Sequence, residues 1–149
     1  MVENSKNMLS PIVLFVYNRP DHTRKTIESL QKNMYAKESV LYIFSDSPKK
    51  KEDADGVQKV RSFIRTIEGF RKVTIIQRKK NFGLAKSIIS GVSQIIEHHG
   101  KVIVLEDDLV SSPSFITYMN RMLENYVSCE QVFSISGYSL PHVLMPGVE

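Results

Sequence analysis

Three adjacent carboxylates, Glu106-Asp107-Asp108, directly follow the apolar run Lys101–Leu105. Carboxylates this close together repel one another unless a cation or a basic group lies nearby. Mg²⁺ and Mn²⁺ take carboxylate oxygens as ligands and commonly bridge them to substrate phosphates. The triplet therefore predicts a site for a divalent cation. The alternative is a solvated acidic turn that merely ends a strand.

Other polar residues that could bind a ligand also stand at the ends of apolar runs. Arg19 could clamp a diphosphate through two parallel hydrogen bonds, and Asp46 could accept hydrogen bonds from a ribose or a base. Asn81-Phe82-Gly83 precedes a helical pattern that carries Lys86 one turn in, and a helix start offers N–H groups to anions. Each also has a purely structural interpretation: a surface arginine, an aspartate in a turn before proline, and a helix-initiating turn.

The elements that must position these residues alternate along the chain. Short apolar runs rich in β-branched and aromatic residues predict strands at 11–17, 40–44, 72–77, 101–105 and 132–136. Apolar residues at helical spacing predict the helices between them. The helical positions are Ile27, Leu30 and Met34; Val57, Val60, Ile64 and Ile67, with a stop at Gly69; Leu84, Ile88, Val92, Ile95 and Ile96, closed by Gly100; and Phe115, Met119 and Met122, with Ser112 as N-cap and Pro113 at the first helical position.

The predicted strands are continuously apolar, which is typical of strands covered on both faces in a parallel sheet. Together with the strand–helix alternation, this predicts an α/β fold, a three-layer sandwich with a mostly parallel sheet. Ligands of such sheets bind at the carboxyl ends of the strands. The polar residues described above stand at those ends.

Composition limits the classes of protein that remain. The chain has 149 residues and a net charge of +4, which suits one globular domain. Residues 1–80 carry 17 basic and 9 acidic residues, whereas residues 81–149 carry 3 and 7, a division that suits an anionic ligand beside a bound cation. The lysine runs lack interleaved aromatic residues, which argues against nucleic-acid binding. A single cysteine, no apolar run of about 18 residues and a polar start make a cytoplasmic location the expectation, with peripheral attachment to a membrane left open.

From about residue 11 to 138 the chain resembles the nucleotide-binding half of the GT-A glycosyltransferases, including those of family 2. The matching pieces, in order, are Phe15-Val-Tyr-Asn-Arg-Pro20, Phe44-Ser-Asp46, Asn81-Phe-Gly-Leu-Ala-Lys86 and Val104-Leu-Glu-Asp-Asp108. The acidic triplet with Ser112-Pro113-Ser114-Phe115 and Val132–Ser136 is especially similar to the N-acetylglucosaminyltransferases that begin complex N-glycan synthesis.

This resemblance implies a metal-dependent, inverting transfer of a sugar from a nucleoside diphosphate, as a UDP- or GDP-sugar, to a glycan or lipid-linked acceptor. By the same resemblance Asp108 is the ligand of Mn²⁺ or Mg²⁺, in a motif of the Asp-x-Asp type. The implied donor-binding residues are Tyr17, Asn18, Arg19, Asp46, Asn81, Lys86, Glu106 and Asp107.

The resemblance also leaves a gap, because the family's acceptor region and catalytic base lie beyond the run that ends near Ser136. The chain stops at Glu149, so we expect a single but incomplete domain over 1–149 with its core at about 11–138. No residue is nominated as the base, and we expect negligible sugar transfer by this chain alone. Loss of the second half would expose apolar surface, which favours self-association. The candidate residues for this are Leu140, Val143, Leu144 and Met145.

Two other functions stay open. A sugar-phosphate nucleotidyltransferase has a related sheet, but it usually places a glycine-rich basic loop after the first strand, where this chain reads Tyr17-Asn-Arg-Pro-Asp21. The other is a non-catalytic nucleotide-binding module, which would bind the donor without turnover. A response-regulator receiver is disfavoured, because its acidic pair after the first strand is missing.

Overall fold

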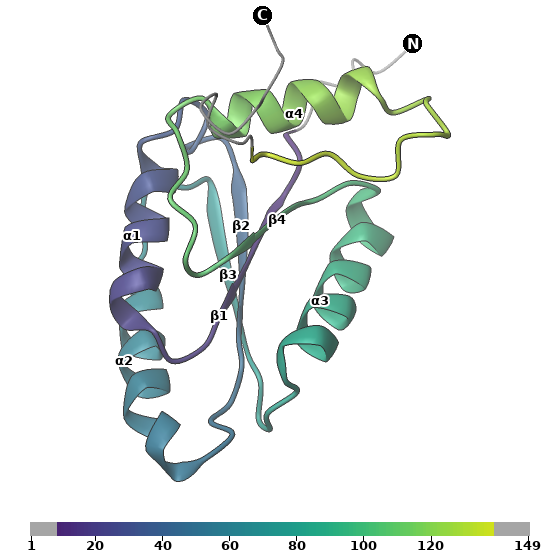
Figure 1. Ribbon diagram of the computed structural model, residues 1–149. Helices are drawn as coiled ribbons and strands as arrows, with labels where there is room; N and C mark the ends of the chain where they lie inside the picture. The colour runs from purple at the N-terminus through teal and green to yellow at the C-terminus, as the bar shows by residue number, and fades with distance from the viewer. Residues whose placement is uncertain (1–8, 139–149) are drawn as a thin grey trace, which may run out of the picture.

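The computed structural model describes residues 9–138, which form one four-stranded sheet. Its strands are β1 (Ile12–Val16), β2 (Val40–Ser45), β3 (Lys72–Gln77) and β4 (Ile103–Glu106). They lie in the order β3-β2-β1-β4, and every neighbouring pair is parallel. The carboxyl ends of the strands therefore all lie at one edge of the sheet, the lower end of the view in Figure 1.

The helices cover both faces of this sheet, as Figure 1 shows. Helices α1 (Pro20–Gln31) and α2 (Ala54–Ile64) lie on one face, and α3 (Leu84–His99) lies on the other. A short 3₁₀ helix, η1 (Lys51–Asp53), leads into α2, and α4 (Phe115–Asn125) follows β4. The predicted three-layer α/β sandwich is confirmed, and the described part of its sheet is entirely parallel.

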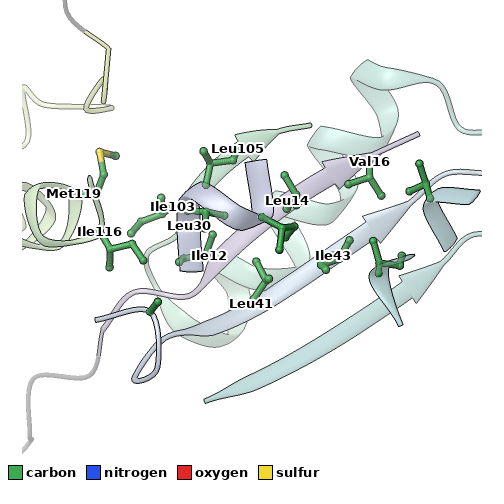
Figure 2. Close-up of a cluster of buried hydrophobic side chains, with 14 residues drawn as sticks. Ile12, Leu14, Val16, Leu30, Leu41, Ile43, Ile103, Leu105, Ile116 and Met119 are labelled. Carbon is green, nitrogen blue, oxygen red and sulfur yellow. The ribbon is translucent and has the colours of Figure 1, made fainter. Parts of the chain in front are cut away.

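Strand β1 sends alternate side chains into two separate cores. Ile12, Leu14 and Val16 join the cluster beneath α1 and α2, which Figure 2 shows, and all three are buried. Val13 and Phe15 point to the other face and pack against α3 residues such as Ile95. Because both faces of β1 are buried, the strand reads as a continuous apolar run instead of an alternating one.

Helix α3 approaches the sheet closely at Gly91. A Cβ atom on Gly91 would lie 2.8 Å from Cε1 of Phe15 and 3.2 Å from Cε2 of Phe44, so only hydrogen fits there without a shift. The Phe15 and Phe44 rings stack at a centroid distance of 5.3 Å directly under this position. The missing side chain lets the helix pack directly on two aromatic rings.

The predicted strand at 132–136 is wrong. Residues 132–136 are irregular, and no described strand pairs with them. Phe133 is fully exposed, whereas Ile135 packs against the core cluster beneath α1 and α2. The apolar pattern therefore reflects contact by one side chain from an irregular segment, because a strand also needs a partner for its backbone groups.

Several predicted ends of elements also shift. Helix α1 ends at Gln31, so Met34 is not on it and is largely exposed. Helix α2 ends at Ile64, before Ile67, which still packs against the core. The N-cap of α4 is Ser114 instead of Ser112. Leu84 was predicted to lie on the apolar face of α3, but its side chain is exposed.

Within residues 9–138, no helix combines the length and the apolar character needed to cross a bilayer.

The close contact at Gly91 leads us to predict that alanine at this helix position lowers the stability of the protein, the opposite of its usual effect. Replacing glycine by alanine inside a helix normally stabilises it by about 1 kcal/mol. We expect Gly91→Ala to lower the free energy of unfolding by about 1–3 kcal/mol, because the added methyl group overpacks the Phe15 and Phe44 rings. Ser93→Ala, at an exposed position of α3, is the control and should change it by less than about 0.5 kcal/mol. Urea unfolding of both variants measures this, and a more stable Gly91→Ala would contradict it.

Candidate functional site

A pocket of about 390 Å³ lies at the carboxyl ends of β1, β2 and β4. Of the nine residues singled out from the sequence, six line it: Tyr17, Arg19, Asp46, Asn81, Glu106 and Asp107. Residues outside these nine complete the wall: Phe15, Val16, Lys49, Gly83, Leu84 and Ser87, of which Gly83 belongs to the Asn81-Phe82-Gly83 segment considered above. Segments far apart in the sequence thus meet at one edge of the sheet, as parallel pairing requires.

Arg19 joins the end of β1 to the acidic triplet after β4. Its Nη2 donates hydrogen bonds to Asp107 Oδ1 and, at 3.2 Å, to Asp108 Oδ2. Partial burial lowers the pKa of Arg19, but the hydrogen bond and the charge of Asp107, together with Asp108, outweigh it and raise the pKa overall. The basic group that the three carboxylates require is therefore supplied by the chain itself.

Asp107 is the most deeply placed carboxylate of the triplet, with 4% of its surface exposed. Its Oδ1 is paired with Arg19, but its Oδ2 is buried and receives no hydrogen bond from any residue in 9–138. A buried carboxylate oxygen without a partner is costly, and such atoms are rare in folded proteins. Asp107 lines the pocket, so a group bound there would lie near this carboxylate.

Asp46, at the end of β2, fastens the loop that precedes α3. Its Oδ1 accepts hydrogen bonds from the backbone N–H groups of Ser47 and Phe82, and its Oδ2 accepts from Phe82 and Gly83, at distances of 2.9–3.0 Å. Gly83 has a φ of +73°, which glycine adopts readily and other residues rarely do. Three donors fill most of the roughly four acceptor positions of a carboxylate. A ribose or base would find about one position left.

Asp53 connects Tyr17 and Asn18 to the lysine loop, which is the segment 49–51 after β2. Sequence reasoning did not find Asp53. Its carboxylate accepts hydrogen bonds from Tyr17 Oη at 2.8 Å, from Asn18 Nδ2 at 2.9 Å and from the Lys50 N–H at 3.1 Å. The hydrogen bond from Tyr17 is the main reason why the pKa of Asp53 is lowered, and burial is the main reason why that of Tyr17 is raised. The only sequence signal was an acidic residue immediately before α2.

Two arginines brace the same edge of the sheet from the side, and neither was selected from the sequence. Arg61 on α2 donates to the backbone oxygens of Asp46 and Arg78 at 3.2 and 2.9 Å, and its Nε donates to Ser45 Oγ. Arg78 lies over the Phe82 ring at 4.1 Å and donates to Ser90 Oγ at 2.9 Å. Nothing in the local pattern around Arg61 distinguishes it from an ordinary surface arginine.

The remaining sequence candidates hold more peripheral positions. Asn81 Nδ2 donates to the Ser47 backbone oxygen at 2.6 Å, which joins the two loops after β2 and β3. Lys86 is exposed and lies over the Phe82 ring at 5.0 Å, outside the pocket lining. Asn18 and Asp108 do not line the pocket either. Asn18 contacts Asp53, and Asp108 contacts the lining residue Arg19. Leu140, Val143, Leu144 and Met145 lie outside the described residues.

The carboxylates suit a cation that takes only part of its ligands from the protein. In the part of the chain that the structure describes, no group of three or more His, Cys, Asp or Glu side chains is arranged to hold a metal ion. Asp108 is about half exposed, however, and Asp107 offers an unpaired oxygen beside it. Mg²⁺-type ions usually need only one or two carboxylates when substrate phosphates supply other ligands.

The hydrogen bonds of Asp46 give a direct test of its structural part. We expect Asp46→Asn to lower the free energy of unfolding by about 1.5–3 kcal/mol, because an amide cannot replace the charged acceptor of three N–H groups. Amide hydrogen exchange at Phe82 and Gly83 should become faster. Asp55→Asn is the matched control, since Asp55 is exposed and its ion pair in the described part of the chain is with exposed Lys59. Unchanged exchange at both amides would show that Asp46 does not hold the loop.

Comparisons with known proteins agree with this geometry. The solved structure titled "Crystal structure of S. aureus TarS" matches with a TM-score of 0.58 and 15% sequence identity, over 80% of this chain. The chain spans only about 20% of the length of that protein, so the likeness shows the fold of one part. A comparison of this chain with curated proteins found no match. The model of the family "Glycosyl transferase family 2" matches residues 12–139, which takes in the whole sheet and the pocket, and the chain therefore belongs to that family.

Proposed function

We propose that this chain binds the nucleoside-diphosphate-sugar donor of a glycosyl transfer reaction, in the pocket at the carboxyl ends of β1, β2 and β4. The observation that carries the proposal is the pairing of Arg19 with a buried Asp107 whose second oxygen has no partner in the described chain. A pocket with one strong cation and one unsatisfied carboxylate is suited to a ligand that brings both phosphate and a counter-cation or hydroxyl groups. Family membership supports the same reaction class.

The division of charge around the pocket suggests how the donor lies. Arg19 is the basic lining residue on the side of Asp107, and a diphosphate would be held there. Asp46, Asn81 and Tyr17 form the wall at β2 and the lysine loop, where the nucleoside would lie. Glu106 and Asp107 would then contact the hydroxyl groups of the ribose or sugar. A UDP- or GDP-sugar has the right chemistry, and the pocket gives no ground for choosing between them.

The proposed cation is Mn²⁺ or Mg²⁺, with Asp108 as its ligand and Asp107 beside it. When bound, such an ion neutralises the charge that grows on the leaving diphosphate. The chain's own part is to hold one buried carboxylate, Asp107, in the pocket lining and a half-exposed one, Asp108, next to it in the sequence. The scarcity of protein ligands makes cation binding depend on the nucleotide.

The proposal also concerns the transfer of the sugar to its acceptor. An inverting mechanism needs a base that removes a proton from the acceptor hydroxyl. We nominate no described residue for this role, because Asp46, Asp107 and Asp108 are taken up by backbone N–H groups, by Arg19 or by the proposed cation, and Glu106 is assigned to hydroxyl groups of the donor. We therefore propose that residues 1–149 alone transfer sugar negligibly. The proposal also includes a glycan or lipid-linked acceptor and a cytoplasmic location. A non-catalytic nucleotide-binding module is the alternative that the same pocket would allow.

A second hollow supports the predicted self-association. It has a volume of about 940 Å³ and lies along β4, which is the edge strand of the described sheet. Its lining includes exposed apolar side chains such as Val104, Leu109, Val110 and Phe133, and among the described residues that line it only Lys101 is charged. An unpaired strand edge beside apolar surface is a template for a second strand. We propose that a second copy of the chain covers it.

The cation prediction is tested by calorimetry with UDP and GDP, with and without Mn²⁺. We expect Mn²⁺ to tighten nucleotide binding, and Asp108→Asn to reduce the affinity measured with Mn²⁺ by at least about tenfold, because it removes the proposed ligand. Asp55→Asn makes the same change of charge on α2 and should have no effect. Equal affinity with and without Mn²⁺ in the unaltered chain would disprove the cation role, and no nucleotide binding at all would disprove the donor site.

Self-association is tested by light scattering over a range of protein concentrations. We expect dimers at high concentration, and Val104→Lys should make the protein monomeric, because a lysine on a strand edge opposes pairing. Ile89→Lys alters another exposed apolar residue, on α3 and outside the hollow, and should leave the dimer intact. A monomer at every concentration would contradict this part.

A further inference from the structure

Arg19 reaches two carboxylates through a single nitrogen. Its Nη2 contacts both Asp107 Oδ1 and Asp108 Oδ2. Within residues 9–138, no other nitrogen of this guanidinium donates a hydrogen bond to a protein group. The group is about half exposed and lines the pocket, so its free N–H groups are available to a ligand. Arginine presents its donors as a fork that matches a phosphate.

The same two carboxylates are the ones proposed to face the divalent cation. Adjacent carboxylates, one of them buried, need a positive partner at all times, since an uncompensated buried charge is strongly destabilising. Arg19 meets this need only in part, because Asp107 Oδ2 stays without a partner. Arg19 thus compensates enough of the carboxylate charge for the chain to fold, and the unpaired oxygen leaves the pair able to accept a stronger cation.

Resting on the proposed function, we propose that Arg19 and the divalent cation are alternative partners of the Asp107–Asp108 pair, and that Arg19 is released to the donor's diphosphate when the cation takes its place. Each ligand then prepares the site for the other. The cation frees the Arg19 guanidinium from the two carboxylates, and the diphosphate gives that guanidinium a new anion. Arg19 is by this account a positioning residue that makes the binding of the two ligands cooperative.

The exchange predicts effects of opposite sign in a single variant. In the unaltered chain, Mn²⁺ and the nucleoside diphosphate should tighten each other's binding by the same factor, about 5–150-fold, as linkage requires. Arg19→Gln should bind Mn²⁺ alone more tightly, because nothing competes for the carboxylates. It should bind UDP or GDP alone more weakly, and the coupling factor should fall to the part that direct contact between the cation and the phosphates supplies.

Calorimetric titrations of Mn²⁺ alone, UDP or GDP alone, and each in the presence of the other test this directly. Arg24→Gln is the matched control, since Arg24 lies on α1 over Phe63 and the variant makes the same change of charge away from the pocket. Thermal unfolding gives a second measurement. Arg19→Gln should melt at a lower temperature than the unaltered chain, and Mn²⁺ should raise its melting temperature more than it raises that of the unaltered chain.

The outcomes separate this inference from the proposed function. If Arg19→Gln weakens nucleotide binding but leaves both the Mn²⁺ affinity and the coupling unchanged, the exchange is wrong and the donor site stands. If no nucleotide binds in any condition, the proposed function is wrong. In that case tighter Mn²⁺ binding in Arg19→Gln would still support the competition for the carboxylates, and equal Mn²⁺ binding in the two proteins would overturn it.

Discussion

The parallel pairing of β1 with β2 on one side and with β4 on the other determines where every polar residue of the pocket lies. Parallel strands place their carboxyl ends at one edge, so residues that follow different strands come within contact distance. Arg19 and Asp107 are 88 positions apart in the sequence and share a hydrogen bond. The pairing in turn requires helices on both faces, because β1 is apolar on both sides.

Electrostatics at this edge balance locally, through a few specific contacts. Arg19 compensates Asp107 and Asp108, while backbone N–H groups compensate Asp46 and the side chains of Tyr17 and Asn18 compensate Asp53. These contacts hold the loops after β1, β2 and β3 together without a ligand. Two buried atoms at this edge have no hydrogen-bond partner within residues 9–138, Asp107 Oδ2 and Arg78 Nε, and the proposed function depends on the first of them.

Much of this architecture could be predicted from the sequence, because apolar runs and helical spacing reflect which side chains are buried. The strand at 72–77 was placed to the residue, and β1, β2 and β4 within two residues at each end. The error at 132–136 arose because apolar character shows burial of side chains but not the presence of a neighbouring strand. Helix ends such as that of α1 shifted for a similar reason, since the loop around Asn33 is fixed by contacts with Ser111 and Ile116, far away in the sequence.

The candidate site was predictable only at the level of position. The rule that ligands of parallel sheets bind at the carboxyl ends of strands selected five residues that line the pocket, and the resemblance to GT-A glycosyltransferases added Tyr17. Sequence reasoning could not find Asp53 or Arg61, because their partners come from other elements and neither stands at a strand end. The same limit applied to the partners of Asp46 and Arg19, which only the folded chain brings together.

The position of Asp46 has a consequence for the start of α3. The N-terminus of a helix carries a partial positive charge that attracts anions, and many phosphate sites use it. Here a carboxylate of the chain already accepts a hydrogen bond from Gly83, the N-cap residue of that helix. A carboxylate of the chain thus already stands at this end of the helix, and a phosphate brought there would meet a charge of its own sign. The positive end of α3 helps to hold the preceding loop in place, so a phosphate would have to be attracted by side chains elsewhere at the pocket, such as that of Arg19.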